Sequence, residues 1–576
     1  MNGIKKIATS RYWWVFLLLL LAGINYLASL VHARFDLTRE KRYTLSKASN
    51  DLLRKLESPV EIDVFLKGEF PAGFRKLANS TEEFLGLLKD ANSSKVRYRF
   101  ISPQDEVPGS TVTWGDSLVG LGAIHINLTV QKKSGESSNI IFPVALMRYN
   151  GRQSLVNIYS GASGAISQEE LNSAEALMEY QFAKTLDGLM TKEPPHIGYA
   201  VGNGEATDGR TYGIQEALSQ DYKLGMLDLQ AFDHIPVDSA DPRRIDVLLM
   251  VKPTQQFTED EIMKIDQYVM RGGKLLLFID NLIAEQDSLR FTRETIAYDR
   301  NLNLTELLFK YGMRINTDLV MDLDCDFMPF VVGGTKENPQ FEFLKWNYYP
   351  LFASKGNHPI VRNTGLVAGR FVNSMDTITT PGIRKTVLLS SSAHSRTIAT
   401  PALISLNENK NVPEDVKFNR RDIPVAILAE GNFTSVFNNR VGKAMADTLA
   451  ARGIPFLSKS RVPGSMIVVG DGDIVLNDLS PKQGPLPMGV NFYTVGSQYE
   501  YQFANRDFFL NCLEYLVNKP GIVETRNKDI VLRLLDGKKV EAQKSTWQLL
   551  NVGLPVLAVL LFGAVYQQVR RRRYGA

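Results

Sequence analysis

Three short acidic loops hold the side chains of this sequence that are best suited to binding a polar ligand. They are Gly202-Asn203-Gly204-Glu205, Asp280-Asn281 and Gly470-Asp471-Gly472-Asp473. Each loop follows an apolar run that indicates a buried strand, and open α/β sheets bind ligands at the carboxyl ends of their strands. We therefore expect a polar ligand or a cation near Asn203, Glu205, Asp280, Asp471 and Asp473. The alternative is a structural role, because Gly, Asn and Asp turn a chain sharply.

The residue types needed for covalent or metal chemistry do not occur in recognisable patterns. Neither Cys325 nor Cys512 stands in a Gly-x-Cys-x-Gly turn, and Gly161-Ala-Ser163-Gly lacks the spacing of a hydrolase nucleophile. The six histidines show no His-x-x-x-His or Glu-x-x-His pairing. A phosphate-binding Gly-x-x-x-x-Gly-Lys-Ser/Thr loop is also absent. We therefore expect no catalytic residues, no metal and no cofactor, and ATP hydrolysis would need another subunit.

The elements that carry the three loops alternate between buried strands and capped helices. Strand-like runs occur at 196–201, 245–251 and 274–280. Between the last two runs, Thr258 followed by Glu261 has the pattern of a capping box that begins a helix. This alternation predicts a doubly wound parallel sheet with helices on both faces, in an α/β domain of residues 165–523.

A smaller β-α-β pattern precedes this domain. A strand pattern occurs over 59–66, where Val60, Ile62 and Val64 alternate with acidic residues, and a helix over 74–90 and a strand over 95–101 follow. Further strand-like runs end near Gly161, which predicts a mixed α/β domain of residues 34–161. The middle of the chain has about 510 residues, too many for one hydrophobic core, so we expect at least two domains.

Two apolar segments, residues 12–31 and 547–566, bracket the chain. Each has about 20 residues, which is enough for an α-helix to cross a bilayer core. Four arginines, Arg570 to Arg573, follow the second segment and would stay on the cytoplasmic side. Residues 1–11 and the basic tail 567–576 are therefore expected inside the cell, with the large middle outside the cytoplasm.

A charged connector, residues 524–546, leads into the second apolar segment. The first segment has an alternative interpretation as a cleavable signal peptide, and the second as a buried core helix. Either alternative alone would leave a single span and the same exposed middle.

Composition restricts the remaining partners and the redox chemistry. The formal net charge is +4, and no concentrated basic face occurs outside the membrane flanks, so we expect no nucleic-acid partner. The two cysteines lie far apart in the sequence, which excludes a disulfide framework. Buried thiols are favoured, although one bridge could form in an oxidising compartment.

Several longer segments, in the same order, carry a family pattern over nearly the whole chain. They are Arg34-Phe-Asp-Leu-Thr, Tyr43-Thr-Leu-Ser, Val64-Phe-Leu-Lys-Gly-Glu-Phe-Pro71, Ile245-Asp-Val-Leu-Leu-Met-Val-Lys-Pro253, Ile265-Asp-Gln-Tyr-Val-Met-Arg-Gly-Gly-Lys-Leu275, Arg314-Ile-Asn-Thr-Asp-Leu-Val-Met-Asp322, Ile427-Leu-Ala-Glu-Gly-Asn-Phe-Thr-Ser-Val-Phe437 and Asn505-Arg-Asp-Phe-Phe-Leu-Asn511. In these segments the chain resembles the gliding-motility-associated ABC transporter auxiliary proteins of Bacteroidetes, the GldG family.

The resemblance implies an inner-membrane protein with two spans and a periplasmic body. Its partners would be a multi-span permease and a separate cytoplasmic ATPase, in an assembly needed for gliding. The implied fold is similar to that of the glutamine amidotransferases, without the amidotransferase nucleophile. Many relatives are expected to carry Gly-His-Gly-Glu where this chain has Asn203, and this departure bears on any ligand role that the loop has in relatives.

These observations support one main hypothesis and two alternatives. The main hypothesis is a non-enzymatic auxiliary subunit whose partners are the membrane, the permease and the ATPase, with self-association in the complex left open. Four small or polar residues in the spans would contact the permease or each other: Gly23, Asn25, Asn551 and Gly553. The first alternative is a solute receptor that binds a sugar or peptide between the two domains, near Glu205 and Asp280. The second is a cryptic hydrolase.

Overall fold

The computed structural model describes most of the chain. The described residues are 13–30, 36, 44–68, 70–123, 125–132, 135–159, 168–191, 193–219, 221–238, 241–284, 289, 294–335, 338–353, 356, 358–406, 415–451, 453–517, 521–527 and 537–574. They divide into one compact unit within Met1–Lys528 and a second within Asp529–Ala576.

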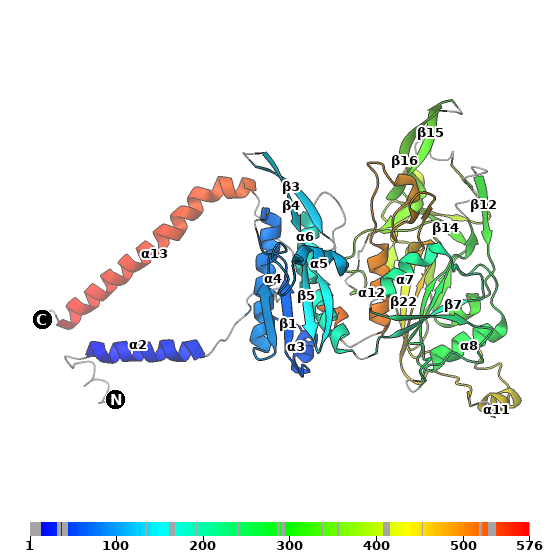
Figure 1. Cartoon of the computed structure of the whole chain (residues 1–576), viewed down its shortest axis with the longest axis horizontal. Coiled ribbons are helices and arrows are strands. Elements are labelled where there is room, and N and C mark those ends of the chain that lie inside the picture. The colour runs from blue at the N-terminus through cyan, green and yellow to red at the C-terminus, as the bar shows by residue number, and fades with distance from the viewer. Residues whose placement is uncertain are drawn as a thin grey trace. The chain divides into compact units, whose positions relative to one another are not determined.

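A four-stranded sheet and three helices form the first part of the larger unit after α2 (Trp13–Leu30) (Figure 1). The strands lie in the order β2-β1-β5-β6, with β1 and β2 parallel and the other pairs antiparallel. The bounds are α3 (Lys47–Arg54), β1 (Val60–Val64), α4 (Ala72–Ala91), β2 (Val96–Phe100), β5 (Val144–Tyr149), β6 (Arg152–Asn157) and α6 (Gln168–Met190). All three helices share an apolar core with this sheet. The β-α-β start expected from the sequence is therefore present as β1-α4-β2.

Shorter elements adjoin the four-stranded sheet. They are α5 (Trp114–Gly120) and the hairpin of β3 (Ile126–Lys132) and β4 (Gly135–Ile141). Thr113 caps α5, because its side chain accepts the backbone N–H of Asp116. The helix places Trp114 against Phe65, with 5.3 Å between ring centroids, in a second small core.

A seven-stranded sheet forms the centre of the second part, in the order β19-β22-β23-β10-β9-β7-β8. The bounds are β7 (His196–Val201), β8 (Lys223–Asp228), β9 (Val247–Val251), β10 (Lys274–Phe278), β19 (Ile383–Ser390), β22 (Pro424–Gly431) and β23 (Gly464–Val469). The strands from β23 to β8 run parallel, as the sequence predicts. The prediction is wrong at one edge, where β22 is antiparallel to both β23 and β19.

The antiparallel edge has a physical reason in its connections. Parallel neighbours need a crossover that packs on a face of the sheet. The helix between β22 and β23, α11 (Lys443–Ala451), buries none of its residues, so it does not act as such a crossover.

Helices cover both faces of the seven-stranded sheet, as expected for a doubly wound fold. Alternate strand residues enter two separate cores: Leu249 lies in one, while Leu248 and Met250 lie in the other. α7 (Tyr212–Leu218) and α12 (Asn505–Val517) cover the first face, and α8 (Glu259–Met270) and α10 (Thr305–Lys310) cover the second. The capping box of Thr258 and Glu261 begins α8, as predicted.

A β-rich segment is inserted between β10 and β22. Its strands are β11 (Leu282–Ile283), β12 (Glu294–Asp299), β13 (Met313–Ile315), β14 (Asp318–Asp322), β15 (Cys325–Gly334), β16 (Pro339–Phe352), β17 (Val367–Ala368), β18 (Met375–Thr377), β20 (Ser395–Ala399) and β21 (Ala402–Ser405), together with β19 of the central sheet. The longest, β15 and β16, form a hairpin (Figure 1). Trp346, Tyr348, Tyr349 and Phe371 pack at the centre of a separate aromatic core.

Short elements complete the larger unit. They are η1 (Gly209–Thr211), η3 (Asp415–Lys417), η4 (Asp473–Val475), β24 (Leu479–Ser480), β25 (Gly484–Pro485), η5 (Phe492–Thr494) and η6 (Val523–Asn527), where η marks a 3-10 helix.

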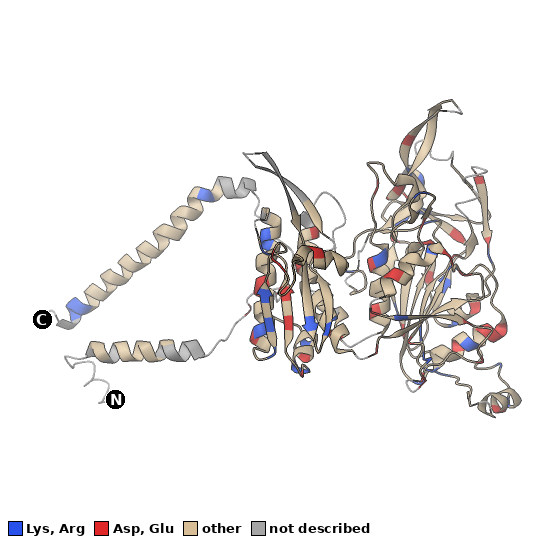
Figure 2. Ribbon diagram, viewed as in Figure 1, with Lys and Arg blue, Asp and Glu red and all other residues tan. Residues whose placement is uncertain are grey.

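Two helices coincide with the predicted membrane segments, namely α2 and α13 (Gly537–Tyr574). Among the described residues, only Gln543–Arg572 of α13 is a helix long and apolar enough to cross a bilayer, with a mean hydropathy of 2.2 and no burial. α2 has 18 residues and exposes leucines such as Leu19. Figure 2 shows basic residues near the C-terminal end of α13. The structure thus gives one candidate span where the sequence predicts two.

Candidate functional site

Two of the three acidic loops meet at the carboxyl edge of the seven-stranded sheet, around Lys252. Lys252 follows β9, Asp280 follows β10 shortly afterwards, and loop 470–473 follows β23, and these three strands are neighbours in the sheet. The Lys252 ammonium lies 2.8 Å from both carboxylate oxygens of Asp473 and 3.1 Å from Oδ2 of Asp280. We call Lys252, Asp280, Asp471 and Asp473 the Lys252 cluster.

Backbone groups close the Lys252 cluster. The N–H of Gly472 donates to Oδ1 of Asp280, and the N–H of Asp473 donates to Oδ1 of Asp471 at 2.7 Å. A Cβ atom at Gly472 would lie 2.5 Å from Cβ of Lys252, so only glycine allows this approach. Lys252 has φ +47°, in the left-handed region that non-glycine residues rarely adopt. The fold accepts local strain to bring this ammonium group to the two carboxylates.

Asp471 joins the cluster to a second buried ion pair. Its Oδ2 accepts the backbone N–H of Arg370 at 2.7 Å. The Arg370 guanidinium donates to both oxygens of Asp478, at 2.6 and 2.7 Å, and lies over the ring of Tyr349, 5.4 Å from its centroid. A bidentate pair of this kind fixes both side chains and therefore the loops that carry them.

Burial controls the protonation of the cluster. It raises the pKa of Asp280 to about 6, although Lys252 opposes the shift. Burial, and then the charges of Asp280 and Asp473, raise the pKa of Asp471 well above its ordinary range. Burial thus disfavours the charged forms of Asp280 and Asp471, and Lys252 lies close enough to Asp280 and Asp473 to offset their negative charge.

The third acidic loop forms a separate cluster at the end of β7. The backbone N–H of Asn203 donates to Oε2 of Glu205 at 2.9 Å, and its side-chain amide donates to Oε2 of Glu261 at 3.3 Å. The same Glu261 oxygen accepts the backbone N–H of Thr258 at 2.7 Å in the capping box of α8. Asn203 therefore ties the β7 loop to the first turn of α8.

Glu205 is the titratable group of this second cluster. Burial raises its pKa to about 7, and the nearby charges of Glu261 and Asp228 add to the shift. Oε1 of Glu205 and Oδ1 of Asn203 are buried and have no hydrogen-bond partner among the described residues. Glu205 therefore gains or loses its proton near neutral pH. The protonated carboxyl group can donate a hydrogen bond, and the buried Oδ1 of Asn203 is an acceptor without a partner among the described residues.

A small polar pocket, partly open to solvent, adjoins the Lys252 cluster. Its lining includes Asp473, Arg370, Asp326, Tyr349 and Asn491. The amide of Asn491 donates to Asp326 at 2.8 Å, and burial raises the pKa of Asp326. The buried hydroxyl of Tyr349 has no partner in the described part of the chain. Because Asp478 already holds Arg370, the cavity suits water or a small neutral polar group.

The membrane residues named from the sequence have few neighbours in their own units. Gly23 and Asn25 are exposed on α2, and Asn551 is exposed on α13. A Cβ atom at Gly23 or Gly553 would meet nothing within 4 Å. Contact of these four residues with a permease stays a prediction.

Groups for metal or thiol chemistry are likewise limited. No three His, Cys, Asp or Glu side chains of the described residues are arranged to hold a metal ion. Cys325 and Cys512 are buried free thiols, as the sequence favours, and burial raises the pKa of both. The two acidic clusters can fix the loops that carry them and exchange protons.

The sequence analysis singled out the carboxylates Glu205, Asp280, Asp471 and Asp473 but not the basic side chains that lie beside them. Lys252 and Arg370 were not singled out, although Lys252 follows an apolar strand and precedes Pro253, a position typical of a loop at a strand end. Whether any of the five predicted side chains binds a ligand stays open to test.

Comparisons with known proteins give two matches to sequence families. A family described as an ABC-type uncharacterized transport system matches residues 194–512, and a domain of unknown function matches residues 39–148. No curated protein matches the chain. Among solved structures, the N-terminal domain of mmIFT52 is 14% identical and covers 57% of this chain and 99% of its own, with a TM-score of 0.30. A likeness at that score carries no argument about fold or function.

Proposed function

The chain belongs to the ABC-type uncharacterized transport system family, and from this membership we propose that it is a membrane-anchored, non-enzymatic accessory subunit of an ABC transport complex. The match to residues 194–512 is the observation that carries the proposal, because it includes the seven-stranded sheet and both acidic clusters. The permease and the ATPase are then separate proteins.

The chemistry of the two clusters supports an accessory role. Lys252 neutralises Asp473 and lies beside Asp280 in the interior, and Asn203 holds the β7 loop to α8. Side chains used in this way set the shape of the loops at the sheet edge, which is where α/β folds meet ligands and partners. A rigid loop surface suits recognition of another subunit.

The proposed topology places both termini in the cytoplasm and the larger unit in the periplasm. The candidate span in α13 and its arginine-rich end support a cytoplasmic C-terminus. The predicted second anchor is α2. A role in a gliding-motility complex follows from the resemblance to the auxiliary proteins of Bacteroidetes and is part of the same proposal.

Affinity purification in a mild detergent tests the accessory role. A tag on the full chain should recover a multi-span permease and an ATPase that carries a phosphate-binding loop, both identified by mass spectrometry. The matched control ends after residue 542 and lacks the candidate span of α13. Recovery of neither partner with the full chain would refute the proposal.

Protease accessibility tests the topology. Protease added to intact spheroplasts should cut the larger unit, whereas protease added to sealed inverted vesicles should leave it intact. Cleavage only in inverted vesicles would place the unit in the cytoplasm and contradict the proposed arrangement.

A second candidate function is binding of a small polar solute. The unpartnered Tyr349 hydroxyl in the cavity beside Asp326 favours it. A ligand present at 100 times its dissociation constant stabilises the folded state by about 2.7 kcal/mol, so a thermal-shift screen with sugars and short peptides detects it. If no compound raises the Tm of the wild type more than that of Tyr349→Phe, this candidate fails.

A further inference from the structure

Both ends of the larger unit pack on the same helix, α6. α3 is the first helix after α2, and η6 is the last described element before α13. α3, α6 and η6 contact one another pairwise, and all three lie within the unit Met1–Lys528. The two segments that lead to the predicted membrane helices therefore meet at one place in the fold.

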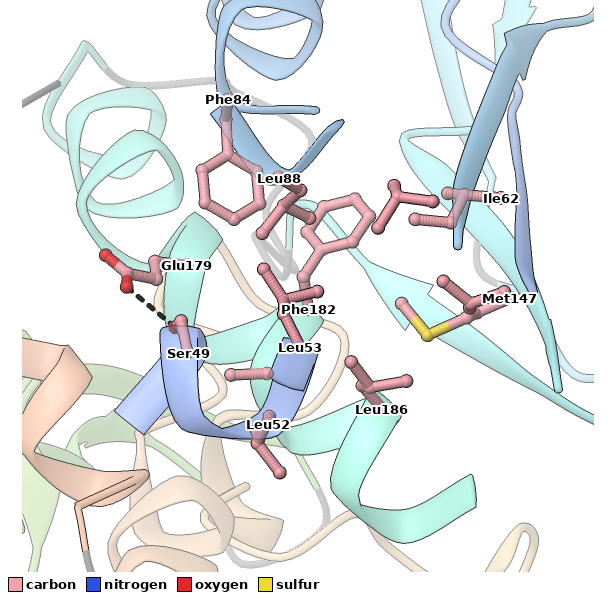
Figure 3. Close-up of a pocket in the computed structure, with 13 residues that line it drawn as sticks. Ser49, Leu52, Leu53, Ile62, Phe84, Leu88, Met147, Glu179, Phe182 and Leu186 are labelled. Atoms are coloured by element: carbon pink, nitrogen blue, oxygen red, sulfur yellow. Dashed lines mark hydrogen bonds between the residues drawn. The ribbon is translucent and has the colours of Figure 1, made fainter. Parts of the chain in front are cut away.

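A buried carboxylate of α6 fastens the beginning of α3. Oε1 of Glu179 accepts the backbone N–H of Ser46 and the hydroxyl of Ser49, each at 2.7 Å, and Figure 3 shows the second bond. Ser46 is the N-cap of α3, where a negative charge is favourable because the helix dipole is positive. Glu179 is 3% exposed, and hydrogen bonds to a charged group in a dry interior are strong.

Apolar side chains pack beneath α3. Leu53 of α3 shares one core with Phe182 of α6 and Leu88 of α4, and Figure 3 shows these side chains around a small apolar pocket. This core holds the body of α3, and the two bonds to Glu179 hold its first turn.

The next residue of α6 fastens η6. The guanidinium carbon of Arg526 lies 4.6 Å from the centroid of the Tyr180 ring, and Arg526 also donates to Oδ1 of Asn511 on α12. Arg526 is 4% exposed, so this cation is buried between α6 and α12. Ile522, just before η6, joins the core that contains Leu53.

α3 also contacts η6 and the residues just before it. A Cβ atom at Gly521, two residues before η6, would lie 3.0 Å from Cβ of Ala48 on α3. About one turn further along α6, Lys184 forms an ion pair with Glu514 of α12, and α6 ends at Met190, a few residues before β7. α6 is thus in contact with both terminal segments and, through α12 and β7, with the seven-stranded sheet.

We propose that α3, α6 and η6 form a clasp that couples the two ends of the larger unit to each other. When α3 detaches from Glu179, η6 loses its contact with α3 and becomes easier to open. When Arg526 is displaced, α3 loses its contact with η6 in the same way. The clasp rests on the proposed function in one respect only, namely that α2 and α13 are membrane anchors. Given those anchors, movement of either membrane helix reaches α12 and the central sheet through α6.

Hydrogen–deuterium exchange on the full chain in detergent, read by mass spectrometry, tests the clasp. Glu179→Ala should raise the exchange rate of α3 about tenfold or more, because two hydrogen bonds to a charged group are lost. The same variant should raise exchange in 521–527. In the reciprocal variant, Arg526→Leu, exchange should rise in η6 and also in α3.

Glu175→Ala is the matched control, because Glu175 is a buried carboxylate on the same helix that binds Lys76 and Ser80 of α4 instead. It should raise exchange in α4 and leave η6 unchanged. Ser49→Ala removes one bond to Glu179 and serves as a milder variant if Glu179→Ala does not fold, with the same pattern at a smaller amplitude.

Opening of α3 without any change in η6, in either Glu179→Ala or Ser49→Ala, would overturn the clasp. The proposed function is judged separately by partner recovery. If exchange in α3 and η6 rises together but no permease is recovered, only the transport role is refuted. If the permease and the ATPase are recovered but exchange in α3 rises without a change in η6, only the clasp is refuted.

Discussion

Replacement of Lys252 by methionine is the sharpest perturbation of the Lys252 cluster. Methionine keeps the length of the side chain and its apolar stem but removes the ammonium group, which lies 2.8 Å from the Asp473 oxygens and 3.1 Å from Asp280. Asp473 then keeps a buried charge without its cation. Removing one partner of a buried ion pair destabilises a fold by about 3–5 kcal/mol.

This free-energy loss converts into a measurable shift in Tm. The unfolding entropy is about 2.1 cal/mol/K per residue, so the compact unit Met1–Lys528 gives about 1.1 kcal/mol/K. Lys252→Met should therefore lower the Tm of this unit by about 3–5 °C at pH 7.5. The shift should shrink at pH 5, because Asp280, whose pKa is raised to about 6, is then protonated and has lost its charge.

Differential scanning calorimetry of the full chain in detergent measures this shift. Arg384→Ala is the matched control, because it breaks a 2.6 Å ion pair with Glu430 in which Arg384 is 73% exposed, and such pairs contribute only about 0–1 kcal/mol. The double variant Lys252→Met with Asp473→Asn should recover part of the loss. A Tm of Lys252→Met equal to that of Arg384→Ala would refute the reasoning.

Three further predictions concern single residues. The pKa of Glu205 is raised to about 7, so its proton stabilises the fold at low pH, and this contribution is lost as pH rises from 4.5 through 7. Glu205→Gln cannot titrate, so its Tm should fall less between pH 5 and pH 8 than the Tm of the wild type. Equal falls in Tm would contradict the raised pKa. Gly204→Ala places a Cβ 2.0 Å from the Thr254 hydroxyl at φ +81° and should cost about 1–3 kcal/mol in calorimetry, whereas Gly225→Ala meets nothing within 4 Å and should cost less. Arg370→Lys replaces the two parallel hydrogen bonds to Asp478 by one and should lower the free energy of unfolding by about 1–3 kcal/mol. An unchanged Tm would show that the paired guanidinium bonds are not needed for stability.

The sequence predicts much of the fold because local patterns decide those elements. The Thr258 and Glu261 capping box begins α8, and the continuous burial of β9 and β10 follows the rule for parallel strands covered on both faces. The antiparallel edge of the sheet is not predictable in this way, because strand direction depends on whether a connection packs on the sheet. The sequence analysis did not identify the β-rich insertion. Short strands such as β11, with two residues, give no periodic pattern, but β15 and β16, with 10 and 14 residues, were long enough to be recognised.

Proximity in the candidate site is partly predictable. Strand-end logic correctly brings Asp280 together with Asp471 and Asp473, since neighbouring parallel strands end at the same edge. The partners of these groups come from long-range packing: Arg370 meets Asp478 across more than a hundred residues, and Lys252 meets Asp473 across 221. No local pattern encodes such pairs, and the same holds for the separation of Glu205 from the Lys252 cluster.

ATP turnover in the affinity-purified preparation tests whether this chain acts through other subunits. The preparation from mild detergent should hydrolyse ATP in proportion to a co-purifying subunit that has a phosphate-binding loop, and removal of that subunit by a high-salt wash should abolish turnover. Turnover that remains with the isolated chain, or a mild-detergent preparation with neither turnover nor a transport subunit, would contradict an accessory role in an ABC transport system.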